Sequence, residues 1–70
     1  MELRSPAVGK VLRMSVEVGA QVARGQELMV IESMKVEILI KANGAGRVKQ
    51  LMVKVGDLVS RHRPLAIIEG

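Results

Sequence analysis

The segment with the clearest potential for chemistry is Glu32–Val36, a run of sequence ESMKV in the middle of the chain. It separates two apolar runs, Leu28–Glu32 and Val36–Ile40, so the chain must reverse tightly at Met34-Lys35. Two-residue hairpin loops favour glycine or asparagine, because both central residues need a positive φ. This loop has neither, and departures from local turn chemistry often mark functional sites. Two interpretations of Lys35 follow: an ordinary exposed lysine on a hairpin, or an amine presented for a function.

Recognisable catalytic constellations are absent from the rest of the sequence. The chain has a single histidine, His62, a single aspartate, Asp57, and no cysteine, too few for the usual nitrogen and sulfur ligands of a metal site. It has no Gly-x-Ser-x-Gly turn to present a nucleophile and no glycine-rich loop ending in Lys-Ser/Thr to hold phosphate. We expect no catalytic residues, no metal, and a protein that is not itself an enzyme.

Composition narrows the class of protein. The 70 residues carry a formal net charge of +4 and include no Phe, Tyr or Trp. An apolar fraction of 49% can fill a small core, which excludes disorder, and a chain without cysteine cannot be a disulfide scaffold. The cations are dispersed along the chain, and there are no aromatic side chains on which bases could stack, so nucleic-acid binding is not expected. The longest aliphatic runs, four residues, are far shorter than a membrane span. We expect a single cytoplasmic domain over residues 1–70, with neither nucleic acid nor a membrane as partner.

The sequence repeats itself. A shift of 37 aligns Ser5–Ser33 with Ala42–Gly70 without a gap, and 10 of the 29 positions are identical. Two halves, 5–33 and 42–70, packed about a pseudo-twofold axis are the simple interpretation. Alternating apolar residues and glycine turns predict short strands, and no helical stripe is present. We expect an all-β fold of roughly eight short strands in two small antiparallel sheets, a flattened barrel or sandwich.

The repeat also places the Met34-Lys35 turn. Its equivalent in the second half falls beyond the C-terminus, and the strand after the turn aligns with the first residues of the chain. The hairpin should therefore lie at one end of the molecule and both chain ends at the other. The shift aligns His62 with Gly25, which predicts a turn residue with positive φ. The strands expected from the patterns lie within Leu12–Val18, Leu28–Glu32, Val36–Ile40, Leu51–Val55 and Leu65–Glu69.

These features resemble the biotinyl/lipoyl attachment family, of the biotin carboxyl carrier type. Its attachment motif is commonly Glu-Ala-Met-Lys-Met, against Glu-Ser-Met-Lys-Val at residues 32–36 here. Ser5–Val11 is similar to the family's opening Ala/Ser-Pro-x-x-Gly-x-Val, and Val18-Gly19 and Val55–Asp57 are similar to its paired turns. The similarity covers essentially the whole chain. The short stretch between Val11 and Gly19 resembles the thumbless form, which we expect to be a free-standing subunit.

The resemblance implies a fold and a function. The fold would be a flattened barrel-sandwich hybrid of two four-stranded antiparallel sheets with an internal pseudo-twofold repeat. Lys35 would be biotinylated through its side-chain nitrogen by a biotin protein ligase, and the flanking residues would assist recognition. The attached biotin would carry a carboxyl group from a biotin carboxylase to a carboxyltransferase of an acyl-CoA-type carboxylase, such as an acetyl-CoA carboxylase of fatty acid biosynthesis. The carrier subunit would have no catalytic residues of its own. The residues implied in recognition around Lys35 are Glu32, Ser33, Met34 and Val36.

Two alternatives stay open. Lipoyl domains resemble this scaffold and typically have Asp-Lys-Ala at the tip. Met34 favours biotin, whereas Ser33 and Val36 depart from the biotin motif, so lipoate or dual attachment is the first alternative. The second is an unmodified structural module, because the same hybrid fold occurs in assembly domains of membrane-fusion-type transport proteins. Such modules normally come with long helical segments, which this chain lacks.

Overall fold

The computed structural model describes residues 1–70 and contains strands but no helix, so no helix is present that could cross a membrane. The strands predicted at 28–32, 36–40 and 65–69 are all present, each extended by one residue at one or both ends. The eight strands are β1 (Glu2–Arg4), β2 (Gly9–Met14), β3 (Gln21–Val22), β4 (Glu27–Ser33), β5 (Val36–Lys41), β6 (Gly46–Leu51), β7 (Leu58–Val59) and β8 (Pro64–Glu69).

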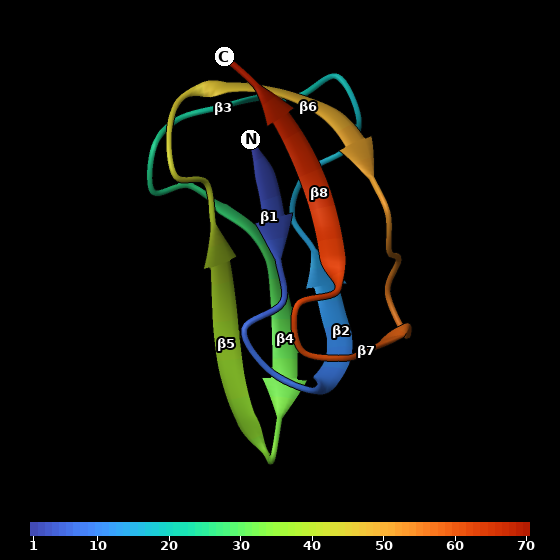
Figure 1. The fold of residues 1–70 in the computed structure, drawn as a ribbon. Coiled ribbons are helices and arrows are strands. Elements are labelled where there is room, and N and C mark those ends of the chain that lie inside the picture. The colour runs from blue at the N-terminus through green and yellow to red at the C-terminus, as the bar shows by residue number, and fades with distance from the viewer.

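The strands form two antiparallel sheets, ordered β1-β8-β6-β3 and β5-β4-β2-β7. The sheets stack as two layers, with the β4–β5 hairpin projecting from one end (Figure 1). No strand of one sheet pairs with a strand of the other. The predicted all-β fold of two four-stranded antiparallel sheets is therefore confirmed, as a flattened sandwich that does not close into a barrel.

Each half of the chain contributes its shortest strand to the sheet of the other half. β3 from the first half pairs with β6, and β7 from the second half pairs with β2. The 37-residue shift relates β2 to β6, β3 to β7 and β4 to β8. The pseudo-twofold axis therefore exchanges the two sheets, and the exchanged strands interlock the halves.

The core consists of two apolar clusters that the repeat relates to each other. Leu28 belongs to one and its equivalent Leu65 to the other, and both side chains are fully buried. Alternation sends one face of each strand inward, which explains why equivalent positions fill both clusters. The larger cluster contains Val11, Met29, Ile31, Ile40, Val53, Val59, Leu65 and Ala66, and the smaller contains Leu3, Val22, Leu28, Ala42, Val48 and Ile68.

The predicted strands over 12–18 and 51–55 are wrong in extent. β2 ends at Met14 and β6 at Leu51. The ladder shifts register around Leu12 in β2 and around Lys49 in β6, which are equivalent positions. A bulge breaks the two-residue period. β2 continues for two residues past its bulge, and the remaining alternation at 15–18 belongs to a loop, in which Val18 is 61% exposed.

Candidate functional site

The Met34-Lys35 turn closes the β4–β5 hairpin. Ser33, the last residue of β4, is paired with Val36, the first residue of β5, so the loop has two residues. Met34 has φ 52° and Lys35 has φ 66°. Positive φ at both central residues is the geometry of a type I′ turn, whose twist matches that of the flanking strands. The sheet therefore imposes a turn that the two side chains do not favour.

Neither side chain of the turn is held by the fold. A residue with a Cβ atom in the left-handed region costs roughly 1–2 kcal/mol. Met34 is 93% exposed and Lys35 is exposed, so burial of these side chains does not offset that cost. The molecule's three ion pairs are Arg4–Glu2, Arg13–Glu27 and Lys49–Glu69, which leaves the Lys35 amine without a carboxylate partner. The amine is free to meet another molecule.

The residues that flank the turn divide between the two faces of the hairpin. Directly opposite residues share a face of an antiparallel pair. Ser33 and Val36 form one such pair, half-buried and 61% exposed respectively. Glu32 and Glu37 form the next pair on the other face, where both are exposed. The site-flanking residues named from the sequence therefore do not converge on the Lys35 amine as a pocket would; they form the end of a two-stranded arm.

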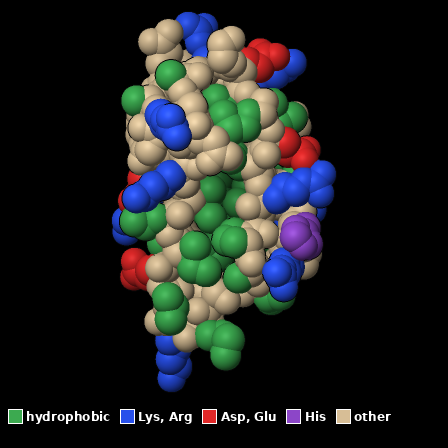
Figure 2. All heavy atoms as spheres, turned by 60° about the vertical axis from the view of Figure 1, so that its left-hand side comes forward, with side chains coloured by type: hydrophobic (Ala, Val, Ile, Leu, Met, Phe, Trp, Pro, Cys, Tyr) green, Lys and Arg blue, Asp and Glu red, His purple; other side chains and the backbone are tan.

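The hairpin tip and the chain ends lie at opposite poles, as the repeat predicts (Figure 1). The N-terminal amine donates to the carbonyl oxygen of Ile68 at 2.7 Å, which holds the start of the chain beside β8. In Figure 2 the hairpin end of the molecule finishes in a cationic side chain, with hydrophobic side chains immediately beside it. A prosthetic group attached at the tip would be clear of the folded body and of both termini.

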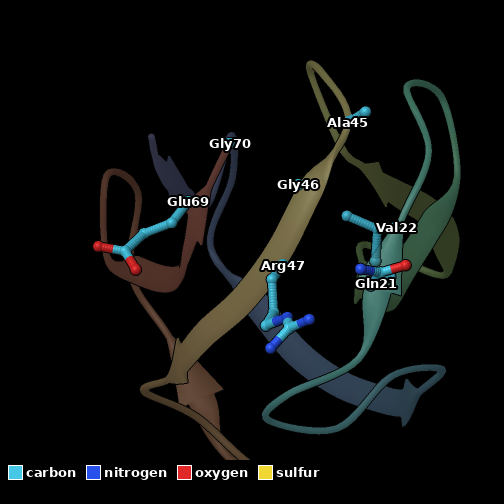
Figure 3. A pocket seen from close by; sticks show the side chains of 7 residues that line it. All are labelled: Gln21, Val22, Ala45, Gly46, Arg47, Glu69 and Gly70. Carbon is cyan, nitrogen blue, oxygen red and sulfur yellow. The ribbon is translucent and has the colours of Figure 1, made fainter.

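A shallow hollow lies at the pole of the chain ends (Figure 3). Its volume is about 470 Å³, and its charged side chains are Arg47 and Glu69. Glu69 already pairs with Lys49 at 3.0 Å. No three His, Asp or Glu side chains gather here or elsewhere as a metal site would require. The hollow is remote from Lys35, and no pattern in the sequence marks it. Its lining residues are Gln21, Val22, Ala45, Gly46, Arg47, Glu69 and Gly70.

Comparison with known proteins agrees with the fold. Residues 1–68 match the biotin/lipoyl family, described as "Biotin-requiring enzyme". Because the match covers nearly the whole chain, the protein belongs to this biotin/lipoyl attachment family. A comparison with curated protein sequences gives no match.

Solved structures similar to this chain include two carboxylases. Urea carboxylase from Kluyveromyces lactis matches with TM-score 0.92 and 30% identity over 99% of this chain and 6% of that one. A single-chain, multi-domain long-chain acyl-CoA carboxylase matches with TM-score 0.89 and 30% identity over 94% of this chain and 7% of that one. The chain thus spans less than a tenth of either carboxylase.

A third similar structure shows the same fold at a comparable size. The lipoyl domain of the 2-oxoglutarate dehydrogenase complex from Azotobacter vinelandii matches with TM-score 0.87 and 22% identity. The alignment covers 100% of this chain and 96% of that one. This likeness concerns the fold alone.

Proposed function

We propose that the protein is a biotin carrier that is modified on the Nζ atom of Lys35. The observation that carries the proposal is the exposed Met34-Lys35 turn, in which both residues adopt positive φ without glycine and the amine has no ionic partner. Membership of the biotin/lipoyl family and 30% identity to two carboxylases support biotin as the group attached.

Attachment requires only an accessible amine from this chain. A biotin protein ligase supplies biotin with its carboxyl group activated. An amide bond forms between Lys35 Nζ and the carboxyl carbon, the bond to the activating group breaks, and the amine loses its proton. Acylation therefore lowers the formal charge from +4 to +3. Met34 offers the ligase a flexible apolar contact beside the amine, and Glu32, Ser33 and Val36 complete the surface of the arm.

The carrier then presents biotin to two enzymes in turn. The attached biotin would supply a site for a carboxyl group, which a biotin carboxylase would add and a carboxyltransferase would transfer to an acceptor such as an acyl-CoA. Tethering replaces free diffusion by a high effective concentration at each enzyme. Placement of the tip at the pole away from both chain ends supports this use, because either enzyme can approach without meeting the termini (Figure 1). Catalysis belongs to those enzymes and not to the carrier.

Intact-mass measurement after co-expression with a biotin protein ligase tests the proposal. We expect one biotinyl increment, mapped to Lys35 by peptide mass, and its loss in Lys35→Arg. Lys54→Arg, an exposed lysine outside the hairpin, is the matched control and should retain the increment. A lipoyl increment on co-expression with a lipoate ligase, in place of the biotinyl one, would assign the chain to the lipoyl carriers. No increment from either ligase would identify an unmodified module.

A further inference from the structure

The most extensive unpaired edge in the molecule belongs to β5. Each sheet ends in two edge strands, of which β3 and β7 have two residues and β1 has three. β5 has six residues, contains no proline and pairs only with β4. No other strand lies along its outer side (Figure 1). A long, regular, uncovered edge is a template for pairing with another strand.

Only some of the backbone groups of β5 are free to pair with another strand. Pairs in an antiparallel ladder alternate between hydrogen-bonded and non-hydrogen-bonded, and the pair that flanks a two-residue turn, here Ser33 and Val36, is hydrogen-bonded. Even-numbered residues of β5 therefore direct their N–H and C=O groups toward β4. Ala42 continues this series, because its N–H donates to Gln26 and its C=O accepts from Gly25, both at 2.9 Å.

The free groups consequently belong to Glu37, Leu39 and Lys41. None of these residues donates or accepts a backbone hydrogen bond outside the β4–β5 ladder. The irregularity in that ladder, between Glu27 and Met29, adds a residue to β4 and leaves β5 regular. The three residues thus present an evenly spaced row of donors and acceptors.

The side chains of the same three residues are self-complementary. They share the outer face of the sheet and are all exposed, Leu39 to 46%. Glu37 and Lys41 lie two residues to either side of Leu39, and neither forms an ion pair within the molecule. Charges on an edge strand normally repel a second strand. Here the two signs are arranged so that an identical strand running the opposite way meets opposite charges.

We propose that β5 pairs antiparallel with β5 of a second copy of this chain, in the register centred on Leu39. Leu39 then lies opposite Leu39 of the second copy, and Glu37 lies opposite Lys41 on both sides of the axis. All of these are hydrogen-bonded positions, so each facing pair exchanges two backbone bonds. On the inner face, Ile38 meets Ile40. The arrangement is isologous, and it joins the two β5-β4-β2-β7 sheets into one continuous sheet.

The surface around this edge fits an apolar contact with a charged border. Figure 2 brings the β5 side forward and shows hydrophobic side chains at the surface, bordered by Lys, Arg and acidic side chains. Pairing over 37–41 leaves Met34 and Lys35 outside the interface, and antiparallel strands direct the two hairpin tips in opposite directions. The proposed interface is thus compatible with Lys35 either free or modified.

Sedimentation equilibrium over micromolar to millimolar protein tests the proposal. Because one strand edge buries little area, we expect a weak, concentration-dependent dimer. Glu37→Lys sets cation against cation at both facing positions, and Lys41→Glu sets anion against anion. Each should weaken association roughly tenfold or more, since two pairs change from attraction to repulsion. The matched controls Glu17→Lys and Lys54→Glu, exposed and outside β5, should dimerise like the wild type.

Mixing the two β5 variants gives the decisive result. An equimolar mixture of Glu37→Lys and Lys41→Glu restores opposite charges at both positions, so a heterodimer should form where each variant alone is monomeric. Circular dichroism establishes that both variants are folded. The proposal is overturned if the wild type stays monomeric at millimolar concentration. The β5 edge would then be available only to a strand of a different protein. It is also overturned if the mixture does not associate more strongly than its components.

Discussion

Gly46 of β6 lies so close to Glu69 of β8 that a Cβ atom on the glycine would collide with the carbonyl oxygen of the glutamate. Gly9 has the same relation to Glu32 in the other half of the repeat. The obstructing atom is in the backbone of a central strand, so no rotation of a side chain can relieve the collision. Because neither glycine has a side chain, β2 can approach β4 closely in the first half and β6 can approach β8 in the second.

Gly46→Ala is therefore expected to destabilise the protein by about 1–3 kcal/mol, the usual range for overpacking a tight contact. Urea denaturation would measure the change. Gly44→Ala is the matched control, because the nearest atom to its Cβ would be the terminal carbon of Met1 at 3.9 Å. Equal midpoints for the two variants would show that β6 and β8 can separate without penalty.

Replacing the turn by Asn-Gly, as Met34→Asn with Lys35→Gly, should stabilise the hairpin. Glycine has no Cβ penalty at positive φ and asparagine has a small one, so a gain of roughly 1–2 kcal/mol is expected from thermal or urea unfolding. Lys35→Ala retains its Cβ atom and should stay within about ±0.5 kcal/mol of the wild type. A large loss in Lys35→Ala would mean that the lysine side chain supports the fold.

Leu28→Ala and Leu65→Ala should be comparably destabilising, at about 2–5 kcal/mol each. Both side chains are fully buried, at equivalent positions of the two apolar clusters. A single small core rarely supplies more than about 3–5 kcal/mol, so either change should leave the chain largely unfolded by circular dichroism. Leu58→Ala, at a side chain that is 83% exposed, is the control and should change little. If only one of the two leucine substitutions lowered the free energy of unfolding, the two apolar clusters would not contribute equally to stability.

Acid should remove a stabilising contribution of Glu27. The Ser15 hydroxyl donates to this carboxylate and Arg13 Nε lies 3.3 Å from it, which together hold the pKa of Glu27 below its ordinary value of 4.5. A lowered folded-state pKa stabilises the protein above the unfolded-state value, and that contribution disappears as the pH falls through the folded-state value. The stability difference between wild type and Glu27→Gln should thus be present at neutral pH and shrink below about pH 4.5. A pH-independent difference in denaturation midpoint would contradict it.

Much of the fold could be predicted because each half of the repeat gives independent information about the structure of the equivalent residues in the other half. The alignment of His62 with Gly25 predicts a positive φ, and the observed values are 70° and 82°. The turn at Met34-Lys35 follows from two apolar runs separated by only three residues, 33–35, whatever the side chains prefer. The bulges at Leu12 and Lys49 were not predictable in this way, because apolar residues continue to alternate past the end of each strand and so resemble a longer, regular strand.

The proposed attachment at Lys35 leaves a choice between biotin and lipoate that depends on neither the repeat nor the fold. Biotin and lipoate are both attached to an exposed lysine on a hairpin of this fold, so the geometry of Met34 and Lys35 is compatible with both. The choice depends on which ligase binds the arm, through contacts that the isolated chain does not contain. The hollow near Arg47 and Glu69 has no sequence signal for a related reason, since residues from three strands and the chain end meet there only after folding.

The exchange of β3 and β7 between the sheets makes local melting difficult, because neither half retains a complete sheet without the other. A nascent or damaged chain that lacks one half therefore has no rigid arm to display. An enzyme that recognises the shape of the hairpin, and not merely its sequence, acts as a quality check on the entire polypeptide. Under that condition, acylation would mark only those molecules whose synthesis and assembly are complete.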